Sequence, residues 1–156
     1  LLPEQLRQNL SISQQAREED CSRVQTAYEE NGVRANVQTF FKDIPDRMSQ
    51  AQLLISRSGA SSVADISIIG RPAIFVPLAA AIRDEQTVNA QELVQAGAAQ
   101  ILPETEFTPQ VLAANILDLI TNGAQMLSMA DAALRCAKPE AATDLADMIE
   151  ALAGDI

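Results

Sequence analysis

The stretch 55–65 combines residue types that can bind an anion. An apolar run ends in a small, hydroxyl-rich turn, and residues of helical character follow at once. Gly59 allows the backbone to approach a ligand closely. The first N–H groups of a helix lack intrahelical acceptors, and the helix dipole favours negative charge beside them. We therefore expect a diphosphate to bind at the N–H groups of Ser61, Ser62 and Val63.

Asp65 lies four residues after Ser61 and three after Ser62, on the same face of this predicted helix. A carboxylate repels phosphate, but it can accept hydrogen bonds from two neighbouring sugar hydroxyls, as acidic residues do for ribose. The segment 62–65 also fits a simpler interpretation, a capping box that only begins the helix. Spacing alone leaves both interpretations open.

Two side-chain amides follow the next apolar run, 73–76, where a loop leads into another predicted helix. Gln86 and Asn89 are three residues apart near the start of that helix, on one face. Adjacent amides offer both donors and acceptors, which suits a neutral polyol such as a sugar. Asp84 and Glu85 also fit an ordinary solvated helix start, and the spacing of this stretch alone favours that second interpretation.

Phe41 stands at the end of a further predicted strand, before a turn. Its ring can lie against a flat group such as a nucleobase, although an isolated Phe is more often a core residue.

Composition excludes several classes of function. The 156 residues carry a net charge of −10 and only 3% aromatics, which disfavours nucleic acid and anionic lipid as partners. The sequence contains no His, so it supplies no His base or His metal ligand. Cys21 and Cys136 are far apart, which favours two free thiols and excludes a zinc site. No apolar run is long enough for a membrane span.

Alternating strands and helices must position these residues. Short apolar runs predict strands at 10–13, 35–41, 53–55, 73–76 and 99–102, and the segments between them have helical spacing at 18–31, 44–51, 61–69 and 84–96. This order predicts an α/β fold with a Rossmann-like parallel sheet and helices on both faces. We expect one domain over 1–156, with 108–153 as its helical C-terminal part. Because the chain starts inside a helix-like segment, we also expect it to be a piece of a longer protein.

Taken together, these stretches resemble the C-terminal, donor-binding half of glycosyltransferase family 28, bacterial N-acetylglucosaminyltransferases of the GT-B fold. The resemblance extends along nearly the whole chain and rests on the order and spacing of a few blocks. These are Arg57-Ser58-Gly59-Ala60 with the helix after it, Gly70 to Pro77, Gln86 with Asn89-Ala90, and Ala96-Gly97-Ala98.

The resemblance implies UDP-GlcNAc as the donor. It places Phe41 at the uracil, Asp65 at the ribose hydroxyls, and Gln86 and Asn89 at the GlcNAc hydroxyls. The implied donor-binding residues are Phe41, Ser58, Gly59, Ala60, Ser61, Ser62, Val63, Ala64, Asp65, Gln86 and Asn89. No catalytic residue is expected within this segment.

The resemblance also implies a reaction. GlcNAc would pass to the MurNAc C4 hydroxyl of lipid I with inversion, making lipid II for peptidoglycan, with no cofactor and no obligatory metal. Lipid I binding, membrane contact and the general base would belong to an absent N-terminal domain, so the segment alone is expected to be inactive. The expected location is the cytoplasmic face of the bacterial inner membrane, as a peripheral protein.

Three departures from the family pattern are visible. Asp65 is one methylene shorter than the family's Glu, Ala80 stands where relatives carry a His, and the glycine-rich strand and turn that open the family's C-terminal half are missing. Two alternatives therefore stay open. One is a related GT-B transferase that uses another UDP-sugar, and the other is a non-catalytic, degenerate nucleotide-sugar-binding domain.

Overall fold

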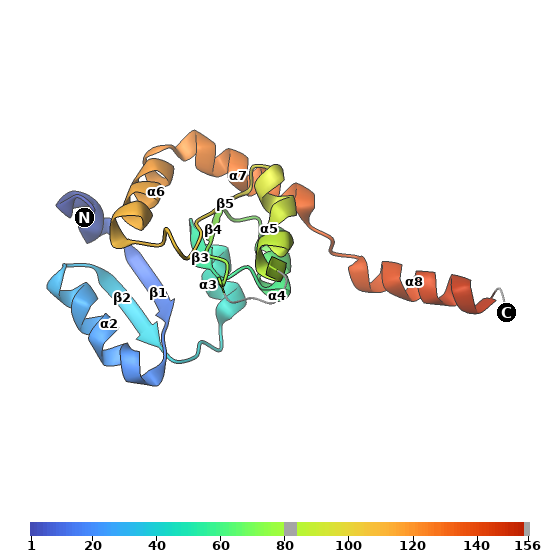
Figure 1. Ribbon diagram of the computed structural model, residues 1–156, viewed down its shortest axis with the longest axis horizontal. Coiled ribbons are helices and arrows are strands. Elements are labelled where there is room, and N and C mark those ends of the chain that lie inside the picture. Colours follow the sequence, from blue (N-terminus) through green and yellow to red (C-terminus); the bar gives the residue numbers. More distant parts are fainter. Residues whose placement is uncertain (80–83, 155–156) are drawn as a thin grey trace. The chain divides into compact units, whose positions relative to one another are not determined.

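The computed structural model describes residues 1–79 and 84–154. The chain forms two compact units (Figure 1), which are described separately. Unit 1 consists of residues 1–50 and 108–121, and unit 2 consists of residues 51–107 and 122–156, apart from the residues outside the description.

Unit 1 is built on two parallel strands. They are β1 (Ser11–Gln15) and β2 (Arg34–Gln38), in register from Ser11 opposite Arg34 to Gln15 opposite Gln38. Helix α2 (Glu18–Glu30) connects them and packs on β2, so the three elements form a βαβ crossover. The remaining helices are α1 (Glu4–Asn9), α3 (Ile44–Gln50) and α6 (Pro109–Thr121).

Unit 2 holds a three-stranded parallel sheet in the order β3-β4-β5. The strands are β3 (Leu54–Ser56), β4 (Ala73–Phe75) and β5 (Ala99–Ile101). The central strand β4 is completely buried, which is the burial expected of a parallel strand covered on both faces. The helices of this unit are α4 (Ala60–Ile69), α5 (Glu85–Gln95), α7 (Gly123–Cys136) and α8 (Ala141–Gly154).

Helices α4, α5 and α7 pack on one another, and α5 also packs on β5. Their buried side chains include Ile66, Leu93 and Met129, which join the residues of β4 in the core of unit 2. Burying apolar side chains of this size contributes about 1.5–3 kcal/mol each. This packing holds α4 against α5 and α7, and α5 against the sheet.

The predicted fold class, an α/β arrangement of parallel strands and flanking helices with a helical C-terminal end, is confirmed. Every predicted strand and helix is present, with shifted ends. The strand predicted over 35–41 ends at Gln38, because the chain turns before Phe41. The prediction of one domain over 1–156 stays a prediction. Within the described residues, no helix has both the length and the apolar character needed to cross a bilayer.

Gly70 ends α4 in a left-handed conformation, with φ +69°, and a Cβ added there would clash with the Leu134 side chain on α7. Gly97 has a similar φ, +76°, but open space around its Cα. We expect Gly70→Ala to lower the free energy of unfolding by about 1–3 kcal/mol and more than Gly97→Ala, since only the first adds crowding to backbone strain. Urea titration of both variants measures the difference, and equal losses would contradict the Leu134 contact.

Candidate functional site

Helix α4 presents free N–H groups at the carboxyl end of β3. Its N-cap is Gly59, with φ −63° and ψ 147°, and the Val63 N–H donates to the Gly59 carbonyl at 3.0 Å. The helix therefore starts one residue earlier than predicted. The N–H groups without an intrahelical acceptor are those of Ala60, Ser61 and Ser62. The expectation that the Val63 N–H is free is wrong, because this group closes the first helical turn, and a ligand contact of Val63 stays a prediction.

The capping-box interpretation of 62–65 is also wrong. Ser62 is the third residue of α4, so it cannot be the N-cap, and the N-cap Gly59 has no side chain that could bond the N–H groups. Among the described residues no side chain caps this helix. The start of α4 thus keeps both its donors and the positive end of its dipole for an anion.

Ser58 directly precedes this helix start and is completely buried. Its Oγ has no hydrogen-bond partner in the described part of the chain. An unpaired buried hydroxyl costs about 1–3 kcal/mol, so a partner at this position would be favourable. The Ser58 carbonyl accepts a hydrogen bond from Asn89 Nδ2 at 3.1 Å. That bond joins the stretch 55–65 to the stretch 76–90, the two that the sequence marks, at the carboxyl end of the sheet.

Asp65 is exposed on α4, one turn after the free N–H groups. Within the described residues its carboxylate makes no hydrogen bond or ion pair, so both oxygens can accept from a ligand. Ala64, beside it, is also exposed and presents only a methyl group.

Gln86 and Asn89 each use one end of the amide within the protein. Gln86 Oε1 accepts the Leu78 N–H at 3.0 Å, and Asn89 donates to Ser58 as described. The sequence predicted that both amides would offer both donors and acceptors. In the structure, Gln86 has its N–H₂ left for a ligand, and Asn89 has its oxygen and one N–H.

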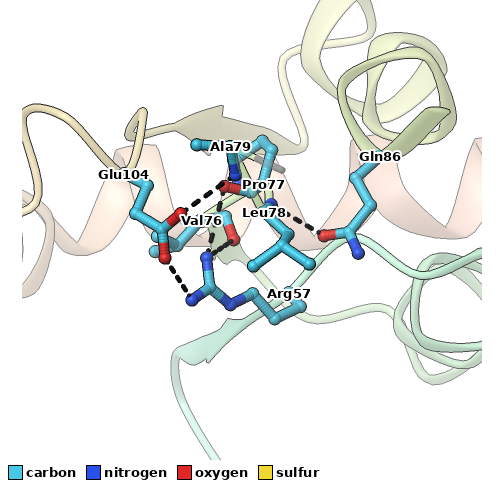
Figure 2. A network of polar contacts seen from close by, with 7 residues as sticks. All are labelled: Arg57, Val76, Pro77, Leu78, Ala79, Gln86 and Glu104. Carbon is cyan, nitrogen blue, oxygen red and sulfur yellow. Dashed lines mark hydrogen bonds and ion pairs between the residues drawn. The ribbon is translucent and has the colours of Figure 1, made fainter. Parts of the chain in front are cut away.

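An ion pair between Arg57 and Glu104 joins the loops that follow all three strands (Figure 2). Arg57 Nη2 lies 2.6 Å from Glu104 Oε1, and the other carboxylate oxygen accepts the Ala79 N–H at 2.9 Å. Arg57 Nη1 also donates to the carbonyls of Val76 and Pro77, at 3.0 and 3.2 Å.

Sequence reasoning used Arg57 only as part of a motif and missed Glu104. No local pattern signals this pair, because β4 separates β3 from β5 and only the strand order places the carboxyl ends of both at one edge of the sheet. In the structure, the Ala79 N–H and then the Arg57 guanidinium hold the pKa of the Glu104 carboxyl below its usual value. Glu104 is therefore charged at neutral pH.

Phe41 lies in unit 1 and is described by itself. It is 3% exposed, and the Arg47 guanidinium stands over its ring, 4.2 Å from the centroid. This burial favours the core interpretation of Phe41, and contact with a nucleobase stays a prediction. Ala80, where the family carries a His, lies outside the described residues.

The described residues include no group of three His, Cys, Asp or Glu side chains that could hold a metal ion. The free N–H groups, the exposed carboxylate and the two amides of unit 2 offer donors to an anion and hydrogen bonds to hydroxyl groups. That combination fits a phosphorylated sugar.

Comparisons with protein families and with known sequences agree on one glycosyltransferase family. The model of the glycosyltransferase family 28 C-terminal domain matches residues 1–149. UDP-N-acetylglucosamine--N-acetylmuramyl-(pentapeptide) pyrophosphoryl-undecaprenol N-acetylglucosamine transferase from Rhodospirillum centenum is 43% identical over 154 residues, which are 99% of this chain and 41% of that protein. The protein of the same name from Brucella canis is 44% identical over 153 residues, 98% of this chain and 40% of that protein. The chain thus spans about two fifths of the length of these relatives.

Two solved structures are similar as well. The crystal structure of Acinetobacter baumannii MurG matches with a TM-score of 0.84 and 33% identity, covering 94% of this chain and 43% of that one. The glycotransferase of kitacinnamycin matches with a TM-score of 0.64 at 17% identity, covering 92% of this chain and 43% of that one, which shows the fold alone.

Proposed function

The chain belongs to the glycosyltransferase family 28 C-terminal domains, and on this premise we propose that it is the donor-binding half of an inverting N-acetylglucosaminyltransferase. The proposed donor is UDP-GlcNAc and the proposed acceptor is lipid I, as the names of the relatives indicate for those proteins. The product would be lipid II, the precursor of peptidoglycan.

The observation that carries this proposal is the uncapped start of α4. Three N–H groups, of Ala60, Ser61 and Ser62, lack intrahelical acceptors, and no described side chain caps this helix start. A diphosphate supplies enough acceptor oxygens for these three donors, and its negative charge is stabilised by the helix dipole. Asp65, one turn further along the same helix, has two free oxygens for the ribose hydroxyls.

The same donors explain how the protein assists the reaction. When the acceptor hydroxyl attacks the anomeric carbon of GlcNAc, the bond from that carbon to the β-phosphate oxygen breaks and UDP leaves with the electron pair. Hydrogen bonds aimed at this developing negative charge lower the barrier. The acceptor proton must pass to a base, and we assign that base to a part of the full-length protein beyond these residues.

The acceptor would reach the site through the N-terminal part of the full-length protein, which would also make the membrane contact. We propose that this protein works as a peripheral protein at the cytoplasmic face of the bacterial inner membrane. The acidic balance of the present segment, net −10, gives no attraction to anionic lipid.

Turnover by the full-length protein tests the proposal. We expect GlcNAc transfer from UDP-GlcNAc to a lipid I analogue, and inhibition by UDP. Unlabelled UDP-glucose and UDP-GalNAc, added as competitors, separate this donor from other UDP-sugars, because Gln86 and Asn89 would contact the sugar. Preference for another UDP-sugar would support a related transferase. Binding of UDP without any transfer would support a non-catalytic, degenerate domain.

A further inference from the structure

The loop Val76–Ala79, called the β4 loop here, is held in place by side chains from other segments (Figure 2). The Arg57 guanidinium is engaged within the protein, because it donates to two loop carbonyls and to Glu104. Glu104 in turn binds the last N–H of the loop, and Gln86 binds the Leu78 N–H. The loop therefore has side-chain partners on both sides.

These residue types suit the task. The loop presents carbonyl acceptors and N–H donors, so a single kind of polar group could not hold it. A guanidinium provides several donors in a fixed plane, and a carboxylate provides two acceptors. Together Arg57 and Glu104 satisfy both kinds of loop group and bond to each other at 2.6 Å. A Lys at position 57 would lack the fork that reaches two carbonyls and a carboxylate at once.

The β4 loop determines which end of the Gln86 amide is presented to a ligand. A backbone N–H can only donate, so Leu78 must bond to Oε1, and the N–H₂ group of Gln86 is the end left over. If the loop moved away, the amide would be free to rotate and present its oxygen instead.

We propose that Arg57 and Glu104 are positioning residues that act through the β4 loop on Gln86, so that the sugar of the donor meets the amide N–H₂. This inference rests on the proposed function, in which Gln86 lies beside the sugar. It predicts a separation of effects, because the proposed diphosphate site is the start of α4, and this helix packs on α5 and α7. Loss of the ion pair should reduce recognition of the sugar and leave recognition of UDP intact.

Titration calorimetry on the full-length protein tests this separation. We expect Glu104→Ala to weaken UDP-GlcNAc binding about tenfold, the loss of roughly one hydrogen bond. UDP binding should change by less than about twofold. Gln86→Met removes the N–H₂ without adding a charge that would repel the diphosphate, so it should show the same sugar-specific loss. The double variant should be no weaker than Gln86→Met alone, since both changes remove one interaction.

Two further variants distinguish positioning from general stability. Glu104→Gln keeps an acceptor oxygen for the Ala79 N–H and should recover part of the lost affinity for UDP-GlcNAc. Glu92→Ala removes an exposed ion pair with Lys138, 3.1 Å long and in the same unit, and should leave both ligands unaffected. Equal weakening of UDP and UDP-GlcNAc by Glu104→Ala, or no weakening of either, would overturn the inference alone. Failure of the unaltered protein to bind UDP would contradict the proposed function and the inference with it.

Discussion

Replacing Ala60 with proline should weaken UDP binding by about 1.5–3 kcal/mol, the range for one hydrogen bond to a charged group. Proline has no N–H, so the variant removes one of the three free donors at the start of α4. The fold should accept the change. Ala60 is the first residue of the helix, where proline is common, and Gly59 already has the extended ψ of 147° that a residue before proline requires.

Titration calorimetry with UDP and with uridine measures this effect. Uridine lacks phosphate, so its affinity should not change, whereas UDP affinity should fall about 10- to 150-fold. Glu18→Pro is a matched control at the first residue of α2, because its N-cap Arg17 has nearly the same conformation, φ −65° and ψ 153°. That variant should bind UDP normally. If Ala60→Pro also bound UDP normally, with an unchanged melting temperature, the start of α4 would not hold the diphosphate.

The second large effect is expected at Asp65. Changing it to Ala should weaken UDP binding by about 1–3 kcal/mol, because two charge-assisted hydrogen bonds to the ribose would be lost. The direction is informative. Removing a negative charge from a protein of net charge −10 should by itself favour an anionic ligand, so weaker binding requires a direct contact.

Asp131→Ala provides the matched control for charge, since Asp131 is exposed on α7 of the same unit. We expect it to leave UDP affinity unchanged or slightly stronger. Asp65→Glu should retain binding, because it restores the longer side chain that the family carries. Identical UDP affinity in Asp65→Ala and the unaltered protein would remove Asp65 from the site.

Most of the fold could be predicted from the sequence, because local signals and tertiary packing agree. Apolar runs predict the strands of both units, and helical spacing predicts the helices between them. The helical part expected from residue 108 onward begins with α6, where the Val111 N–H donates to Thr108 Oγ1 at 3.3 Å. The strand end near Phe41 was placed too late, since an apolar residue can continue a strand or enter the core from a turn.

The site was predictable in part. The small residues of the turn at 55–65 identify this part of the site. The free N–H groups begin at Ala60, one residue earlier than predicted, because Gly59 is the N-cap and has no side chain. Contacts between distant segments could not be read from spacing. The bond from Asn89 to Ser58 spans 31 positions, and the pair of Arg57 with Glu104 spans 47. Such partners depend on how the strands are ordered in the sheet, which no local pattern specifies.

The most direct test of the account is a crystal structure of the full-length protein with UDP-GlcNAc bound. The account predicts diphosphate oxygens at about 2.9 Å from the backbone nitrogens of Ala60, Ser61 and Ser62, with the ribose at Asp65. Nucleotide density at any other place, or an α4 start closed by the protein's own side chains, would contradict it.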